Sequence, residues 1–187
     1  MNKGKLFVIS GASGVGKSTV LKSVTEQRED LLFSVSVTTR PPREGEIDGV
    51  HYDFITRERF LAMVEEDAFA EYDIHHSACY GTPRKQMEEK LEKGHVILDI
   101  DPNGAFQVRK RYPEVTLIFI TPPSYEELET RLRGRNDGMA EEKILGRLER
   151  ARWEMEQSVH YDHVVINDDV ERCAGEILNI ISNKEHE

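Results

Sequence analysis

Apolar residues follow two patterns along the chain, continuous runs and stretches with helical spacing. Runs made mostly of apolar residues are typical of buried parallel strands, and they fall at 6–9, 96–101, 115–120 and 164–166, the second of them with carboxylates at its C-terminal end. Stretches with one apolar face predict helices over 18–27, 103–111, 140–157 and 170–182. Strands and helices therefore mostly alternate, which predicts an α/β fold with a parallel sheet flanked by helices.

The region 33–83 departs from this alternation. Short alternating runs at 33–37, 51–55 and 68–74 predict strands, with a single helix at 57–66 between them. We therefore expect 33–83 to form a small, mostly antiparallel subdomain inserted between core segments 1–32 and 84–187. Thr82-Pro83 fits a helix N-cap followed by proline at the first helical position.

The polar stretch 133–141 contains two glycines and two arginines. This composition favours a mobile lid, which we expect to span about 129–150. Ser124 and Glu127 form a capping box that opens the helix before it. In the helix after it, Ile144, Leu148, Ala151 and Met155 form the predicted apolar stripe.

Residues 11–18 fit the phosphate-binding pattern Gly, four residues, Gly-Lys-Ser, between a predicted strand and a predicted helix. Glycines let the backbone curl so that several N–H groups converge on one anion, and the helix start adds partial positive charge. Lys17 is expected to reach the β- and γ-phosphates, and the Ser18 hydroxyl to ligate Mg²⁺. The alternative interpretation is a glycine turn that binds nothing.

Composition narrows the function classes. The net charge is 25 − 35 = −10, which argues against a general nucleic-acid binder. No apolar run approaches the roughly 20 residues of a membrane span, and the N-terminus lacks the apolar region of a signal peptide. Cys79 and Cys173 are expected to be free thiols in a reducing compartment, and the histidines form no persuasive metal-ligand set. We expect a cytoplasmic protein that is a monomer or a homodimer, with neither nucleic acid nor membrane as partner.

Other classes of P-loop protein fit less well. Residues 101–104 supply the Asp-x-x-Gly pattern of a GTPase, but the Asn-Lys-x-Asp guanine reader is absent. The Leu-Ser-Gly-Gly-Gln signature of ABC-type ATPases is absent too. The length, the insert and the arginine-bearing lid instead favour a nucleoside monophosphate kinase.

The insert and several later segments make the interpretation more specific. The chain resembles the guanylate kinase family over nearly its whole length, in segments 34–46, 48–54, 80–82, 97–101, 122–124, 131–135 and 167–169. The resemblance implies transfer of the γ-phosphate of ATP to GMP and dGMP, giving ADP and a guanosine diphosphate, with Mg²⁺ as cofactor.

The resemblance also implies the acceptor residues. The GMP phosphate would be held by Arg40, Arg43, Tyr52 and Tyr80, and guanine would be read by Ser36, Glu71, Thr82 and Asp101. The chemistry agrees, because arginine offers phosphate a planar fork and a carboxylate accepts from the N1–H and 2-amino groups that adenine lacks. For Asp99 two interpretations stay open, a ligand and a residue that simply closes its strand.

On the donor side, the ATP-binding set comprises Gly11, Ala12, Ser13, Gly14, Val15, Gly16, Lys17, Ser18, Thr19 and Asn167, with Asn167 near the adenine. The expected catalytic set is Lys17, Arg43, Arg131, Arg135 and Arg147. Arg131 and Arg135 are four residues apart, so they share a helix face. Arg150 is expected to be more solvated.

Two alternatives remain: a guanylate-kinase-like binding module without catalysis, and a related kinase with another phosphate acceptor; a GTPase is a distant third. The intact P-loop argues against the first, and the guanine-reading residues argue against the second. The sequence departs from the family pattern at 77–79, where Ser-Ala-Cys replaces the common Gly-Asn-Tyr, and at Asn103, where glutamine is common. Both departures border the expected GMP site and bear on acceptor affinity.

Overall fold

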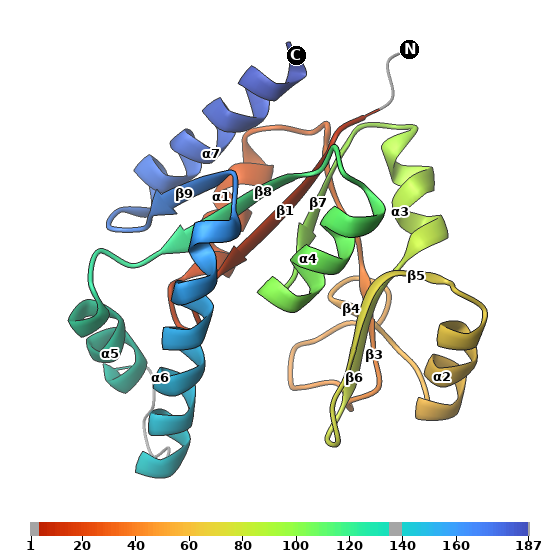
Figure 1. Ribbon diagram of the computed structural model, residues 1–187, viewed down its shortest axis with the longest axis horizontal. Helices are drawn as coiled ribbons and strands as arrows, with labels where there is room; N and C mark the ends of the chain where they lie inside the picture. Colours follow the sequence, from red (N-terminus) through yellow and green to blue (C-terminus); the bar gives the residue numbers. More distant parts are fainter. Residues whose placement is uncertain (1–3, 135–139, 187) are drawn as a thin grey trace. The chain divides into compact units, whose positions relative to one another are not determined.

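The structure is a computed structural model that describes residues 4–134 and 140–186. The chain divides into two compact units, one comprising Met1–Leu6 and Asp30–Val115, the other Phe7–Glu29 and Thr116–Glu187. Figure 1 shows the elements of both units along the chain. Each unit carries parallel strands joined through helices, so the predicted α/β class is confirmed.

The second unit is built on three parallel strands. Its elements are β1 (Leu6–Gly11, beginning at the last residue of the first unit's N-terminal segment), α1 (Lys17–Glu26), β8 (Thr116–Thr121), α5 (Tyr125–Gly134), α6 (Glu141–Glu156), the 3₁₀ turn η1 (Gln157–His160), β9 (His163–Ile166) and α7 (Val170–Glu185). Strand β8 pairs with β1 on one side and with β9 on the other (Figure 1).

Burial explains why these segments adopt this arrangement. Most of β1 and β8 is inaccessible to solvent, as expected of strands covered on both faces. The predicted face of α1, which consists of Val20, Leu21 and Val24, is buried, and α1 packs against α7. Each fully buried aliphatic side chain contributes about 1.5–3 kcal/mol to folding, so this core fixes the strand end from which the glycine loop starts.

The first unit contains the predicted insert together with later core elements. Its elements are β2 (Leu31–Phe33), β3 (Ser36–Thr38), β4 (Tyr52–Phe54), α2 (Arg57–Glu65), β5 (Phe69–Ile74), β6 (Cys79–Pro83), α3 (Arg84–Leu91), β7 (His95–Asp99) and α4 (Pro102–Arg111). Strands β2 and β7 form a parallel pair. The other four form a separate sheet in the order β4-β3-β6-β5, in which β6 is antiparallel to both neighbours and β3/β4 is parallel.

Two predicted boundaries in this unit are wrong. The expected strand 33–37 is two strands, because Phe33 pairs with Ile97 of β7 whereas Ser36 pairs with Tyr52 of β4. The chain thus changes sheets over two residues. Thr82 lies inside β6 rather than at a helix cap, since α3 begins at Arg84 with Pro83 at its N-cap position and no side-chain cap bond.

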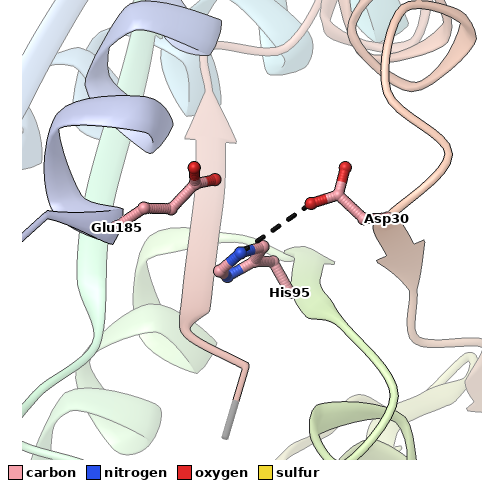
Figure 2. A group of neighbouring side chains, drawn as sticks. All are labelled: Asp30, His95 and Glu185. Atoms are coloured by element: carbon pink, nitrogen blue, oxygen red, sulfur yellow. Dashed lines mark ion pairs between the residues drawn. The ribbon is translucent and has the colours of Figure 1, made fainter. Parts of the chain in front are cut away.

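His95 connects the start of β7 to neighbouring segments of the first unit. Its Nδ1 accepts a hydrogen bond of 3.0 Å from the Lys5 N–H, and its Nε2 lies 3.8 Å from an Asp30 carboxylate oxygen (Figure 2). The neighbouring backbone adds a hydrogen bond from the Val96 N–H to the Lys5 carbonyl.

Across the described ranges, no helix has the length and apolar character needed to cross a membrane.

Candidate nucleotide-binding sites

The glycine loop in the second unit runs from the end of β1 to the start of α1. Gly14 and Gly16 have φ angles of 88° and 94°, in the left-handed region that favours glycine. A Cβ atom on Gly14 would lie 2.5 Å from Leu132 Cδ2, and one on Gly16 would lie 3.0 Å from Asn167 Nδ2. Both positions therefore require glycine for backbone conformation and for space.

Few of the loop's backbone N–H groups are used internally. The Val15 N–H donates to the Ala12 carbonyl. In the first turn of α1, the Thr19 and Val20 N–H groups donate to the Gly16 carbonyl. Among the described residues, the N–H groups of Gly14, Gly16 and Ser18 have no protein acceptor. These donors lie at the positive end of α1, an arrangement suited to a polyanion such as a phosphate chain.

Asn167 and Arg131 converge on one carbonyl of the loop. The buried Asn167 donates from Nδ2 to the Val15 carbonyl at 2.8 Å. Arg131 Nη1 donates to the same carbonyl at 3.3 Å and to the Asn167 carbonyl at 3.0 Å, while Glu127 accepts from its Nε at 3.0 Å. The structure thus brings two of the sequence-predicted donor residues to the glycine loop.

Glu154 of α6 is a contact of the loop that the sequence analysis missed. Its side chain is nearly buried; Oε2 accepts from the Ser13 N–H at 2.8 Å, and Oε1 accepts from Arg150 Nε at 3.0 Å. Helical spacing could have identified Glu154, because it lies three residues after Ala151. The structure buries Glu154 at this point of α6 rather than the predicted Met155. The side chain of Arg150, which the sequence analysis expects to be solvated, is 40% exposed, and its guanidinium lies 4.8 Å from the Trp153 ring centroid.

Of the other two arginines expected in the lid, the structure describes Arg147. Arg147 lies on α6, is half-buried and forms no hydrogen bond or ion pair with another residue that the structure describes. Arg135 lies outside the described residues. The predicted helix face shared by Arg131 and Arg135 therefore stays a prediction.

Arg40 in the first unit is held by a carboxylate. Its Nη1 and Nη2 donate to the two oxygens of Glu46 at 2.6 Å each, and its guanidinium lies 5.0 Å from the Tyr52 ring centroid. Glu46 also accepts from the Arg43 N–H at 2.7 Å. The Arg40 hydrogen bonds, followed by the one from Arg43, lower the pKa of Glu46 to about 2, and the same ion pair raises the pKa of Arg40.

Glu71 and Thr82 form a buried pair across β5 and β6. Both side chains are at most 6% exposed, and the Thr82 hydroxyl donates to Glu71 Oε1 at 2.6 Å. Burial raises the pKa of Glu71 to about 7; the Thr82 hydrogen bond opposes this shift, and the nearby charge of Asp101 adds to it. A Cβ atom on Gly104 would lie 2.7 Å from Glu71 Oε2, so glycine at the start of α4 makes room for this carboxylate.

The other predicted acceptor residues lie on neighbouring elements of the same unit. Asp101 caps α4, where its Oδ1 accepts from the Gly104 N–H at 2.9 Å. Ser36 and Tyr80 are half-buried on β3 and β6, adjacent strands of the four-stranded sheet. All eight predicted GMP-site residues thus belong to the first unit, whereas the glycine loop, Arg131, Arg147 and Asn167 belong to the second.

Cys79, one of the departures from the family pattern, is part of the insert's core. Its side chain is buried in a cluster with Val37, Phe60 and Phe69. Its N–H donates to Thr39 Oγ1 at 2.8 Å. The unusual residue therefore contributes a core side chain on the strand that carries Tyr80 and Thr82. Asn103, the other departure, is exposed on α4.

Comparison with known proteins gives consistent matches across the chain. The guanylate kinase family model matches residues 3–184. A guanylate kinase of Thermus thermophilus is 48% identical over 96% of this chain and 81% of its own length, and one of Neisseria gonorrhoeae is 46% identical over 96% and 88%. A crystal structure of guanylate kinase from Anaplasma phagocytophilum superposes with a TM-score of 0.80 at 34% identity, covering 99% of this chain and 88% of that one.

Proposed function

The chain belongs to the guanylate kinase family, and from this membership we propose that it transfers the γ-phosphoryl group of ATP to GMP, yielding ADP and GDP. The observation that carries the proposal is the complete glycine loop, with its open amides, Lys17 and Ser18 at the start of α1, in a chain nearly half identical to named guanylate kinases. A binding module that had lost catalysis would have no need of this loop.

Guanine recognition is assigned to Glu71, Thr82, Ser36 and Asp101. In its ionised form, Glu71 can accept from both the N1–H and the 2-amino group of guanine. The Thr82 hydroxyl hydrogen is already donated to Glu71, so its oxygen is left to accept. Adenine offers no such donor pair, and pairing with it would leave a buried carboxylate unsatisfied, which is the basis for rejecting AMP.

The GMP phosphate is assigned to Arg40, Arg43, Tyr52 and Tyr80. Tyr52 and Arg40 are already in contact, and the Arg40 fork is held in place by Glu46. A guanidinium held in this way loses less conformational entropy when it binds a phosphate. Residues 33–83, which include this four-stranded sheet, form the proposed GMP-binding subdomain.

The ATP phosphates are assigned to residues 11–19, with Lys17 at the β- and γ-phosphates. Arg131, Arg135 and Arg147 would neutralise charge that develops on the transferring group, from a lid of about 129–150. Asn167 contacts the loop backbone at Val15 and is assigned to the neighbourhood of the adenine. These groups bind and orient the donor.

Mg²⁺ fits the loop through Ser18. This hydroxyl is exposed at the second position of α1, and a single protein oxygen suits an ion that keeps most of its ligands as water and phosphate oxygens. When bound, the ion would supply positive charge to the phosphate chain.

Catalysis in this proposal needs no general base. The acceptor is an anionic phosphate oxygen, so the protein's contribution is to place the two nucleotides in line and to neutralise charge. Lid closure would exclude water that could otherwise accept the phosphoryl group. Because both cysteines are free and buried, we also place the enzyme in a reducing compartment, the cytoplasm.

The decisive experiment is a coupled ADP-release assay with MgATP and each of the four nucleoside monophosphates. We expect turnover with GMP and dGMP, and poor turnover with AMP and CMP. Absence of GMP-dependent ADP release would refute the kinase assignment. Preference for a non-guanine acceptor would refute the roles of Glu71 and Thr82 while leaving the donor site in place.

A further inference from the structure

We propose that Glu154 is a positioning residue for ATP, which ties the glycine loop to α6 through Ser13 and is kept electrically balanced by Arg150. The proposal rests on the proposed function, since it takes the loop to be the ATP site. All of its residues lie in the second unit. Neither Glu154 nor Arg150 belongs to the donor set inferred from the sequence.

The first observation is that a buried carboxylate holds the entry of the loop. Glu154 is 7% exposed and accepts the Ser13 N–H at 2.8 Å. A hydrogen bond to a charged acceptor is shorter and stronger than one between neutral groups, so this contact fixes Ser13 firmly. The N–H groups of Gly14, Gly16 and Ser18, which follow the fixed Ser13 along the loop, are then left to bind phosphate.

The second observation concerns charge. A carboxylate in contact with the loop would repel ATP if its negative charge were uncompensated, because the protein interior screens charges weakly. Arg150 Nε donates to the other oxygen of Glu154 at 3.0 Å, and the Arg150 guanidinium is itself supported by the Trp153 ring. Arg150 therefore makes a buried carboxylate tolerable beside a polyanion site.

The third observation is the position of Arg147 on the same helix. Arg147, Arg150 and Glu154 follow a spacing of three and four residues, so they share one face of α6. Seven residues correspond to nearly two full turns and about 10 Å along the axis. The bond between Ser13 and Glu154 thus fixes one end of the face on which Arg147 lies, and couples the loop's geometry to that arginine.

The test uses binding of ATP and GMP, measured separately by titration calorimetry on full-length protein. The variants are Glu154→Ala, Glu154→Gln, Arg150→Met and the double variant Arg150→Met/Glu154→Gln. Glu149→Ala is the matched control, because Glu149 is an exposed carboxylate on the same helix. Thermal unfolding of each variant reports whether the fold survives.

We expect Glu154→Ala to weaken ATP binding about tenfold, with GMP binding within twofold of wild type. Glu154→Gln keeps an oxygen for the Ser13 N–H and should stay within about threefold for ATP. Arg150→Met should weaken ATP binding, and adding Glu154→Gln should restore it, because the neutral amide removes the uncompensated charge. A purely structural role would change ATP and GMP binding together, so a loss and a rescue confined to ATP distinguish the positioning role from it.

The proposal is overturned if Glu154→Ala binds ATP as tightly as Glu149→Ala does, or if it loses ATP and GMP affinity to the same degree. It is equally overturned if the double variant binds ATP no better than Arg150→Met. Should Glu154→Ala fail to fold, the comparison of Arg150→Met with the double variant decides. Because these titrations need no turnover, failure of the kinase assignment would appear separately, as wild-type protein that binds ATP without phosphorylating GMP.

Discussion

The residues assigned to the two substrates are held in different ways. In the first unit, the proposed acceptor groups are paired with other side chains, as in Arg40 with Glu46 and Glu71 with Thr82. In the second unit, the proposed donor groups mainly contact the loop backbone, as Asn167 does at the Val15 carbonyl. From this difference we expect acceptor selectivity to depend on the chemistry of side chains and donor binding to depend on the shape of one loop.

The largest effect is expected from Lys17→Ala. Removing the positive charge that we assign to the β- and γ-phosphates should lower kcat about 100- to 1,000-fold. Steady-state ADP release at saturating ATP and GMP measures it. Lys22→Ala, an exposed lysine on the same helix, is the control and should stay within twofold of wild type. A Lys17→Ala enzyme with near-normal kcat would contradict the assigned donor role.

The next largest effect concerns the shape of the loop. Gly14→Ala combines a left-handed backbone with a Cβ placed 2.5 Å from Leu132, so it should lower the free energy of unfolding by about 2–4 kcal/mol. Gly45→Ala shares the positive φ angle but meets nothing within 4 Å, and should cost about 1 kcal/mol. Urea unfolding of both variants checks the difference, and equal losses would show that the contact with Leu132 does not matter.

Glu71→Gln tests the acceptor side. Loss of a charged acceptor of guanine donors should lower kcat/KM for GMP about 10- to 100-fold, with the KM for ATP unchanged. Because the pKa of Glu71 is about 7, a proton must leave before GMP binds at lower pH, so wild-type GMP affinity should fall as the pH drops below 7. The GMP phosphate titrates in a similar range. The pH dependence of GMP affinity that persists in Glu71→Gln measures the contribution of the GMP phosphate. Identical pH profiles of GMP affinity for wild type and Glu71→Gln would contradict the role of Glu71.

The smallest effect is expected from Glu46→Gln and concerns acid stability. The folded-state pKa of Glu46 is lowered to about 2 from 4.5, so its stabilising contribution is present above pH 4.5 and is lost as the pH falls through 2. Glu71 behaves in the opposite sense, since its raised pKa makes stability fall as the pH rises from 4.5 towards 7.

In thermal melts across this range, Glu46→Gln should show a shallower loss of stability at acid pH than wild type. Glu44→Gln, an exposed neighbour in the same loop, provides the comparison. An unchanged slope in Glu46→Gln would mean that the ion pair with Arg40 contributes nothing in solution.

The sequence predicted the features that follow from local patterns. Continuous apolar runs gave the strands β1, β7, β8 and β9, and the glycine spacing located the loop. The split between β2 and β3 was not predictable in this way, because it depends on which distant strand each short segment pairs with. Thr82 was mistaken for a helix cap for a related reason, since its partner Glu71 lies across a sheet.

The candidate site was predictable as a list of residues but not as a set of contacts. Arg131 and Asn167 were expected on the donor side, yet their shared contact with the Val15 carbonyl depends on three distant segments. Glu154 was missed because the apolar stripe was continued from Ala151 to Met155, four residues on, whereas α6 buries Glu154, three residues on. A carboxylate in an apolar stripe signals a buried partner, and such a residue can be sought in other sequences.

The separation of donor and acceptor residues is tested most directly by titrating GMP into Lys17→Ala in a calorimeter, with wild type as reference. We expect a GMP dissociation constant within about twofold of wild type despite the large fall in kcat, because every proposed GMP contact lies in the first unit and Lys17 lies in the second. Loss of GMP binding in a Lys17→Ala protein whose thermal midpoint is unchanged would contradict it.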